Sequence, residues 1–374
     1  MTNGIWGKYL GPALLIAVLA LCFCCGPLAA QTIRDLPPPP PAPTPKPTPT
    51  PGPPKDEDFD VIKVNSNLVM VPVSVVDATG QPIHGLQVND FRLDEEGRPQ
   101  QIVEIGNPDQ VPLDIALLFD VSSSVSNKGF FAFQQKAAAA FLKQVLKPAD
   151  RAAVFTITDQ ARLIEPLASS DVAAARLLTI PAATTPVPTA FYDTVVAAAK
   201  YLNEKSADRH RRVILVISDG DDNFSSLIRD LTIAEVRAEQ KGETTPAAAR
   251  QNLLARRQRA VLEVQRAVQQ ADVAFYSINP GGPSVHLNLI STRAQNDMAS
   301  IAQSTGGTAF VPDSDKDLER VFGEVAAELR GQYLLQYYSN SQAPGVQFRR
   351  IVVGLPTHTE LRVRARQGYY PKGK

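Results

Sequence analysis

A carboxylate and alternating hydroxyls directly follow a short apolar run about one third of the way along the sequence. Residues 115–119 (IALLF) are unbroken apolar, which is typical of a central parallel strand covered by helices on both faces. Asp120 ends the run, and Ser122 and Ser124 follow it in the spacing DxSxS. Open α/β sheets bind their ligands at the carboxyl ends of such strands. Oxygen ligands without Cys or His suit Mg²⁺ or Mn²⁺, so we expect one of these ions here.

Two later stretches supply the rest of such a metal site. Residues 212–218 (RVILVIS) are a second buried-strand run, and Asp219 follows it in the sequence SDGDD. Thr189 lies between the two runs, in PTAFYDTVVAAAKYL, just before a helical pattern. For Asp120 and Asp219 the alternative is an ordinary turn residue at a strand end. The candidate metal ligands are Asp120, Ser122, Ser124, Thr189 and Asp219.

This constellation of aspartates and hydroxyls resembles the metal-ion-dependent adhesion site (MIDAS) of von Willebrand factor A (VWFA) domains. The resemblance implies an α/β fold with a doubly wound, mostly parallel, Rossmann-like sheet. It further implies that Ser122 and Ser124 coordinate the metal through their hydroxyls, and Thr189 directly or through water. Asp120 and Asp219 would act largely through water and fix the serines. Neutral hydroxyl ligands leave the cation electrophilic, and in this family an Asp or Glu of a partner protein can complete its shell.

The approach to Thr189 departs from the family pattern. The family usually has Gly just before the Thr, whereas residues 186–188 here are Pro-Val-Pro. Proline fixes φ, so we expect a site that switches less readily between open and closed forms. Thr184 or Thr185 could replace Thr189, although the match PTAFYD favours Thr189. Thr189 could also serve as a helix N-cap.

Residues 1–30 have the pattern of a signal peptide. Lys8 precedes an apolar run over residues 13–23, and Leu28-Ala29-Ala30 ends the segment. The run is short for a membrane span. An uncleaved anchor, which would tether the protein to a membrane, is the alternative, because Leu28 is not a small residue. We therefore expect an exported protein that is secreted, periplasmic or associated with the cell envelope.

The three cysteines of the chain all lie within this segment, at Cys22, Cys24 and Cys25. Leu21 precedes Cys22, where a lipoprotein would need a small residue, so lipid attachment ranks below simple secretion. The processed protein would then hold no cysteine and would be stable without disulfides, which its size allows.

The remaining segments predict a proline-rich linker and a β module around the metal-binding domain. Residues 31–58 form the linker, since twelve of residues 37–54 are Pro. Residues 59–110 and 332–374 contain β patterns, and we expect both flanks to join in one β-sandwich-like module, because domain termini often lie close together. The flanks, with LVMVPVSVVDATGQPIHGLQVNDFRLDEEGRPQQI and RVRARQGYYP, resemble secreted bacterial VWFA-related proteins through most of residues 60–371.

Strand and helix alternate within residues 111–331, which we expect to form the VWFA domain. The pattern includes a helical insertion at about 225–270, whose arginines would lie on a solvated face neutralised by nearby glutamates; a basic patch is the alternative. The expected helices cover residues 130–146, 171–178, 190–203, 227–240, 246–270, 293–303 and 316–331.

Composition and motifs argue against several classes of function. Basic and acidic residues are balanced, 38 against 38, so nothing indicates nucleic-acid binding. The four histidines have no ligand spacing, and neither a GxSxG elbow nor a phosphate-binding loop occurs. We therefore expect no enzyme but an exported, divalent-metal-dependent protein-binding or cell-adhesion module. The alternative is an envelope assembly or scaffold factor whose metal site recruits a subunit of another complex. A third hypothesis, ranked below these two, is a metal-dependent hydrolase that uses Asp219 or Asp221.

Overall fold

The computed structural model describes residues 68–122, 131–282, 289–314, 317–341 and 347–371. All of them belong to one compact unit, Val64–Lys374. The expected signal peptide, the expected linker and Ser124 lie outside the described residues. No helix in the described part of the chain is long and apolar enough to cross a membrane.

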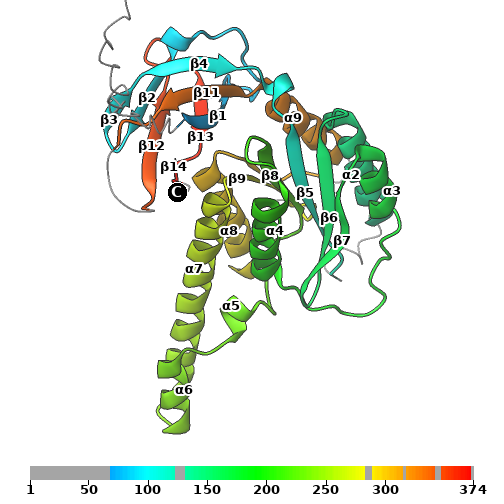
Figure 1. The fold of residues 1–374 in the computed structure, drawn as a ribbon. Coiled ribbons are helices and arrows are strands. Elements are labelled where there is room, and N and C mark those ends of the chain that lie inside the picture. The colour runs from blue at the N-terminus through cyan, green and yellow to red at the C-terminus, as the bar shows by residue number, and fades with distance from the viewer. Residues whose placement is uncertain (1–67, 123–130, 283–288, 315–316, 342–346, 372–374) are drawn as a thin grey trace, which may run out of the picture. The chain divides into compact units, whose positions relative to one another are not determined.

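A mostly parallel sheet occupies the middle of the chain (Figure 1). Its strand order is β10-β9-β8-β5-β6-β7, and every neighbouring pair is parallel except the antiparallel pair β6–β7. The expected doubly wound, mostly parallel α/β fold is therefore confirmed. The strands are β5 (Leu113–Asp120), β6 (Arg151–Ile157), β7 (Ala161–Ala168), β8 (Arg211–Ile217), β9 (Val273–Ile278) and β10 (Ala309–Phe310).

Helices cover both faces of this sheet, and the alternation along β5 shows how (Figure 1). Leu117 and Phe119 pack on one face with α2, α3 and α9, whereas Ala116 and Leu118 pack on the other with α4, α7 and α8. Every residue of β5 is buried, which explains why residues 115–119 are apolar without alternation. The helices are α2 (Phe131–Val145), α3 (Ser170–Leu177), α4 (Phe191–Lys205), α5 (Ser226–Arg229), α6 (Ile233–Gln240), α7 (Pro246–Gln270), α8 (Leu289–Thr305) and α9 (Leu318–Gly331).

The two flanks of the chain pair with each other in a sandwich of two antiparallel sheets, as the sequence predicts. One sheet has the order β13-β1-β11-β4 and the other β14-β12-β2-β3, so each contains strands from both flanks. Val71, Leu93, Leu335 and Tyr337 belong to one apolar core between the sheets. The strands are β1 (Leu68–Val76), β2 (Arg92–Glu95), β3 (Arg98–Gln100), β4 (Ile102–Gly106), β11 (Tyr333–Tyr338), β12 (Arg349–Gly354), β13 (Arg362–Ala365) and β14 (Gly368–Tyr369).

The helical insertion differs in one respect from the expectation. The single helix expected over residues 227–240 is two helices, because α5 ends at Arg229 and α6 begins at Ile233. Thr232 starts the second helix through a reciprocal capping box: its hydroxyl accepts from the Glu235 N–H, and its own N–H donates to the Glu235 carboxylate at 2.7 Å. Thr232 is thus a favourable N-cap within the helical sequence pattern, and a new helix begins after it.

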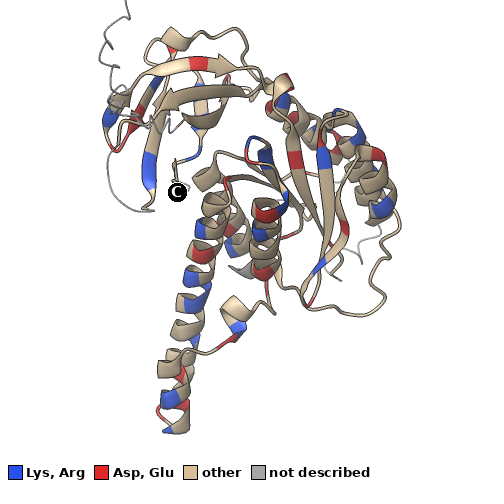
Figure 2. Cartoon of the chain, viewed as in Figure 1, with Lys and Arg blue, Asp and Glu red and all other residues tan. Residues whose placement is uncertain are grey.

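α7 packs into the apolar core only through its second half. Its buried side chains are Ala260, Val264 and Val268, all in the second half. Figure 2 shows both signs of charge along α6 and α7. Arg256, expected on a solvated face, is instead mostly buried and forms an ion pair with Glu235 of α6. This ion pair joins the two helices of the insertion.

Candidate metal centre

Asp120 lies at the carboxyl end of β5 and is fully buried. One carboxylate oxygen, Oδ1, accepts a hydrogen bond from the Ser122 N–H at 2.8 Å. The other, Oδ2, accepts from the Ser218 hydroxyl at 2.5 Å. Since both oxygens are held, the carboxylate has a fixed orientation at the edge of the sheet where the sequence predicts the metal.

Asp219 places a second negative charge beside Asp120. Burial and the charge of Asp219 together raise the pKa of Asp120 to about 6, although hydrogen bonds from Ser218 and Ser122 oppose the shift. Neither carboxylate forms an ion pair with a Lys, Arg or His among the described residues. A divalent cation would relieve this repulsion, so the donors fit a metal of the magnesium type.

Gly220 lets the chain turn immediately after Asp219. Its φ is +75°, and a Cβ there would lie 2.7 Å from Cε of Met298, which is buried in α8. The Gly220 N–H donates to the Ser218 hydroxyl at 2.9 Å, so that hydroxyl links this turn to Asp120. Only glycine meets both the backbone and the space requirement here.

Thr189 is buried and clamped to the loop that follows Asp219. Its N–H donates to Oδ1 of Asn223 at 2.9 Å, and its carbonyl accepts from the Asn223 and Phe224 N–H groups, both at 3.1 Å. No described residue hydrogen-bonds its hydroxyl, which leaves that oxygen available to a metal or water. The N-cap of α4 is Ala190, so the N-cap role considered for Thr189 is wrong. Thr184 and Thr185 are exposed, which favours Thr189 over them.

Asp222 anchors the acidic loop, and sequence reasoning missed its role. The side chain is 2% exposed and accepts hydrogen bonds from the Tyr192 N–H at 2.8 Å and from the Ser225 hydroxyl at 2.5 Å. Burial raises its pKa, and the bonds from Ser225 and Tyr192 oppose that shift. Asp222 thereby joins the acidic loop to Tyr192, the second residue of α4. The sequence signal is a run of Asp, Asn and Ser residues after a strand, which favours side-chain-to-backbone bonds.

The structure brings most of the predicted site residues to one edge of the sheet. Asp120 is the last residue of β5, Ser122 follows it, and Asp219 follows β8. Thr189 is hydrogen-bonded to the loop after Asp219. Ser124 lies outside the described residues. The described residues contain no group of three or more His, Cys, Asp or Glu side chains that could hold a metal. A metal at this edge would therefore depend on hydroxyl ligands, and the five ligands stay a prediction.

The strand order, the antiparallel edge strand β7 and the acidic and hydroxyl side chains after β5 define the class of this domain. Residues 113–331 form an α/β domain with a doubly wound, mostly parallel sheet, which is the fold that the resemblance to von Willebrand factor A domains implies. No protein-family model matches the sequence. No curated protein matches it either.

Several solved structures are similar to this chain at low identity. One is the vWF domain of the type V pili tip protein Mfa5 from Porphyromonas gingivalis, with 12% identity, a TM-score of 0.42, and coverage of 58% of this chain and 94% of that one. Another is an aerotolerance-related membrane protein from Bacteroides fragilis, with 12% identity, a TM-score of 0.37, and coverage of 57% and 98%. A third is proximal thread matrix protein 1 from the mussel byssus, described with a zinc-occupied MIDAS motif; identity is 16%, the TM-score 0.41, and coverage 64% and 50%.

Proposed function

We propose that this protein is an exported protein-binding module that captures an acidic side chain of a partner protein through a divalent metal. The metal would be Mg²⁺ or Mn²⁺, held by Asp120, Ser122, Ser124, Thr189 and Asp219. One observation carries the proposal: a fully buried carboxylate, Asp120, is fixed beside Asp219, and neither forms an ion pair within the described part of the chain. Buried charges in proteins are paired or coordinate metals.

The residues around the metal would leave it able to bind a carboxylate of a partner protein. When bound, the ion would offer a carboxylate a coordination position, because its ligands from this chain are largely neutral hydroxyls. Asp120 holds the Ser122 backbone through its own Oδ1, and this bond orients the serine that the DxSxS pattern assigns to the metal. Asn223 holds the Thr189 backbone through its Oδ1.

Export is a part of the proposal that rests on the amino-terminal pattern alone. The charged start, the apolar run and the small-residue end of residues 1–30 support it. Either secretion or attachment to the cell envelope would place the metal site outside the cytoplasm. There the site would be accessible to divalent cations and to partner proteins.

Metal binding is tested first, by isothermal titration calorimetry with MgCl₂ and MnCl₂. We expect one site that Asp120→Ala removes while circular dichroism shows a folded protein. Asp230→Ala is the matched control, because Asp230 is an exposed acid that contacts Arg229 on the surface. Equal metal binding by Asp120→Ala and Asp230→Ala would contradict the assigned site.

Partner binding is tested second, by capture from envelope and extracellular fractions. The protein is used with Mg²⁺, with chelator, and with chelator followed by excess Mn²⁺. We expect capture with Mg²⁺ and with Mn²⁺, and none with chelator alone. Replacement of the critical Asp or Glu of a captured protein by its amide should weaken binding tens-fold or more, since a lost buried charged contact costs about 2–5 kcal/mol. Full-strength capture in chelator would place the interface elsewhere.

A further inference from the structure

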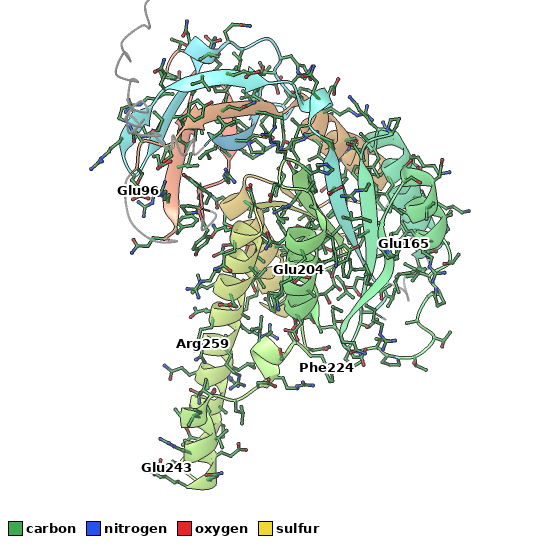
Figure 3. All side chains as sticks on the ribbon, viewed as in Figure 1. Glu96, Glu165, Glu204, Phe224, Glu243 and Arg259 are labelled. Atoms are coloured by element: carbon green, nitrogen blue, oxygen red, sulfur yellow. The ribbon has the colours of Figure 1, made fainter. Side chains whose placement is uncertain are left out.

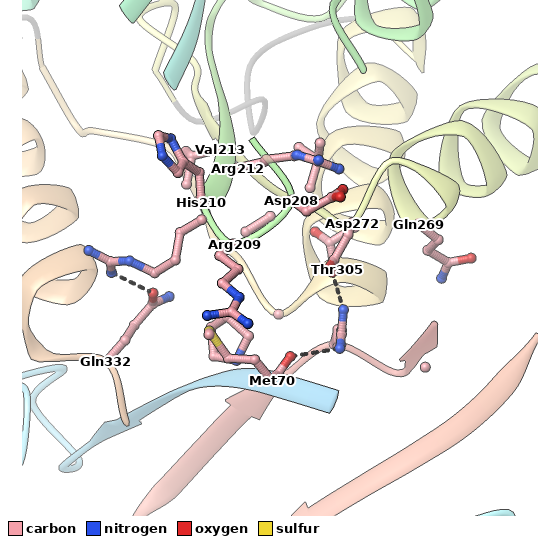
Figure 4. Close-up of a pocket in the computed structure, with 17 residues that line it drawn as sticks. Met70, Asp208, Arg209, His210, Arg212, Val213, Gln269, Asp272, Thr305 and Gln332 are labelled. Carbon is pink, nitrogen blue, oxygen red and sulfur yellow. Dashed lines mark hydrogen bonds and ion pairs between the residues drawn. The ribbon is translucent and has the colours of Figure 1, made fainter. Parts of the chain in front are cut away.

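A cavity of about 80 Å³ lies at the opposite ends of the central strands from the metal centre, where the sandwich meets the sheet (Figure 4). The sandwich contributes Met70 of β1 and Arg366 to its wall. The central domain contributes Arg209, the first residues of β8 and Asp272, which precedes β9. The site described above leaves this cavity unexplained.

Positive charge predominates around the cavity. Four arginines line it, at positions 209, 211, 212 and 366, against two acids, Asp208 and Asp272. Arg366 forms an ion pair with Asp272 and donates to the Met70 carbonyl at 2.7 Å, both marked in Figure 4. That pair neutralises one of the acids within the wall. The lining therefore keeps a net charge of +2 even when both acids are ionised.

Two arginines at the start of β8, the half-buried Arg211 and the buried Arg212, donate hydrogen bonds only to neutral acceptors. Arg211 bonds the carbonyls of Leu329 at 2.7 Å and Pro108 at 3.1 Å. Arg212, which is 5% exposed, bonds the Ala271 carbonyl at 2.8 Å and Oδ1 of Asn203 at 3.2 Å. These bonds satisfy donors but do not cancel charge. A buried guanidinium group such as that of Arg212, which has no acidic hydrogen-bond partner, is unfavourable unless an anion is near.

Donor capacity around the cavity also exceeds the acceptors that the described chain supplies. The Nε atoms of Arg211, Arg212 and Arg366 are buried and have no hydrogen-bond partner among the described residues. Arg366 itself is 8% exposed. Arg209 is exposed at the rim and makes no hydrogen bond or ion pair with a described residue; Figure 4 shows its side chain reaching toward Met70.

We propose that this cavity binds a small, doubly charged oxyanion of the phosphate or sulfate type. Guanidinium groups match the geometry of such oxyanions, and charge-assisted bonds to them are among the stronger hydrogen bonds. The cavity has room for a few water molecules and therefore for a small free ion. The anion would touch arginines of both the sandwich and the central domain, and so would stabilise the packing of one against the other.

Calorimetric titration of the protein with inorganic phosphate, and separately with sulfate, tests this inference. Ionic strength is held constant with NaCl, and metal is absent. We expect saturable binding of one ion and a melting temperature that rises with its concentration, because a ligand that binds only the folded state stabilises it. Arg209→Gln should weaken binding about tenfold, since a charge-assisted bond contributes roughly 1.5–3 kcal/mol. Arg209→Lys, which keeps the charge, should lose less.

Arg259→Gln is the matched control, because Arg259 is an exposed arginine of α7 away from the cavity (Figure 3). It removes the same charge, and phosphate affinity should not change. Arg209 is exposed, so its variants should melt like the parent protein when phosphate is absent. Equal weakening by Arg209→Gln and Arg259→Gln would show general electrostatic attraction and overturn the site. Absence of saturable binding of either oxyanion would overturn it as well.

Discussion

The Ser218 hydroxyl donates to Asp120 across 2.5 Å and so joins the ends of two adjacent parallel strands, β5 and β8. The same hydroxyl accepts the Gly220 N–H at 2.9 Å. One small side chain therefore sets both the orientation of Asp120 and the turn that carries Asp219. The relationship makes Ser218 a positioning residue of the proposed metal centre.

Ser218→Ala should weaken Mg²⁺ or Mn²⁺ binding about 10–100-fold, the usual effect of losing a residue that orients metal ligands. The fold should survive, because the change removes one buried hydroxyl and no apolar contact. Titration calorimetry with each metal measures the affinity. Ser226→Ala serves as the control, since the Ser226 hydroxyl bonds Asp193 and not a predicted ligand. Equal metal affinity in both variants would exclude the positioning role.

Gly220→Ala should destabilise the protein by two separable effects. The positive φ costs about 1 kcal/mol or more in any L-residue, and the new Cβ would also contact Met298. Gly242→Ala isolates the first effect, because Gly242 has a φ of +69° and no atom within 4 Å of its Cβ position. Urea unfolding should show a larger loss for Gly220→Ala. Met298→Ala in the Gly220→Ala background should cost less than it does in the parent protein.

Asp114 should make stability depend on acid pH. Burial raises its pKa, but hydrogen bonds from Arg151 at 2.8 Å and Ser206 at 2.6 Å outweigh burial, and the pKa is lowered overall. The folded pKa thus lies below the unfolded value of about 3.9, so the carboxylate stabilises the fold above that pH. The contribution is lost as the pH falls through the folded pKa. Asp114→Asn should lower the free energy of unfolding at pH 7 by about 3 kcal/mol and flatten its decline toward pH 3. An unchanged pH profile in urea unfolding would contradict this.

Removal of residues 332–374 should expose the amino-terminal strands to proteolysis. β1 pairs with β11 and β13, and β2 pairs with β12, so the truncation removes both neighbours of β1 and one of β2. Limited trypsin digestion with mass spectrometry should detect cleavage at Arg92, which precedes Leu93 in β2. The central domain, with its own two apolar cores, should resist. Protection of Arg92 equal to that in the full chain would mean that the amino-terminal flank folds alone.

The apolar runs of the sequence predict the central strands because burial on both faces requires them. Asp120 and Asp219 were recognisable as candidates because each directly follows such a run. Asp222 and Asn223 were not, because their hydrogen bonds to Tyr192 and Thr189 depend on how two loops meet across the edge of the sheet. The sequence contains the signal for the Thr232 cap, since Thr and Glu three residues apart form a capping box. The helical periodicity around it concealed the break.

The sandwich also determines the order in which the protein can fold. The Tyr369 hydroxyl bonds the buried carboxylate of Glu95 across 274 residues of sequence, and β1 lies between two strands from the far flank. Synthesis produces the amino-terminal strands first, and their edges then lack neighbours until nearly the whole chain has emerged. Unpaired strand edges associate readily with other chains. The contacts of the central domain are nearer in sequence, so this domain can fold during that interval. Once folded, it would keep the two flanks near each other until their strands pair.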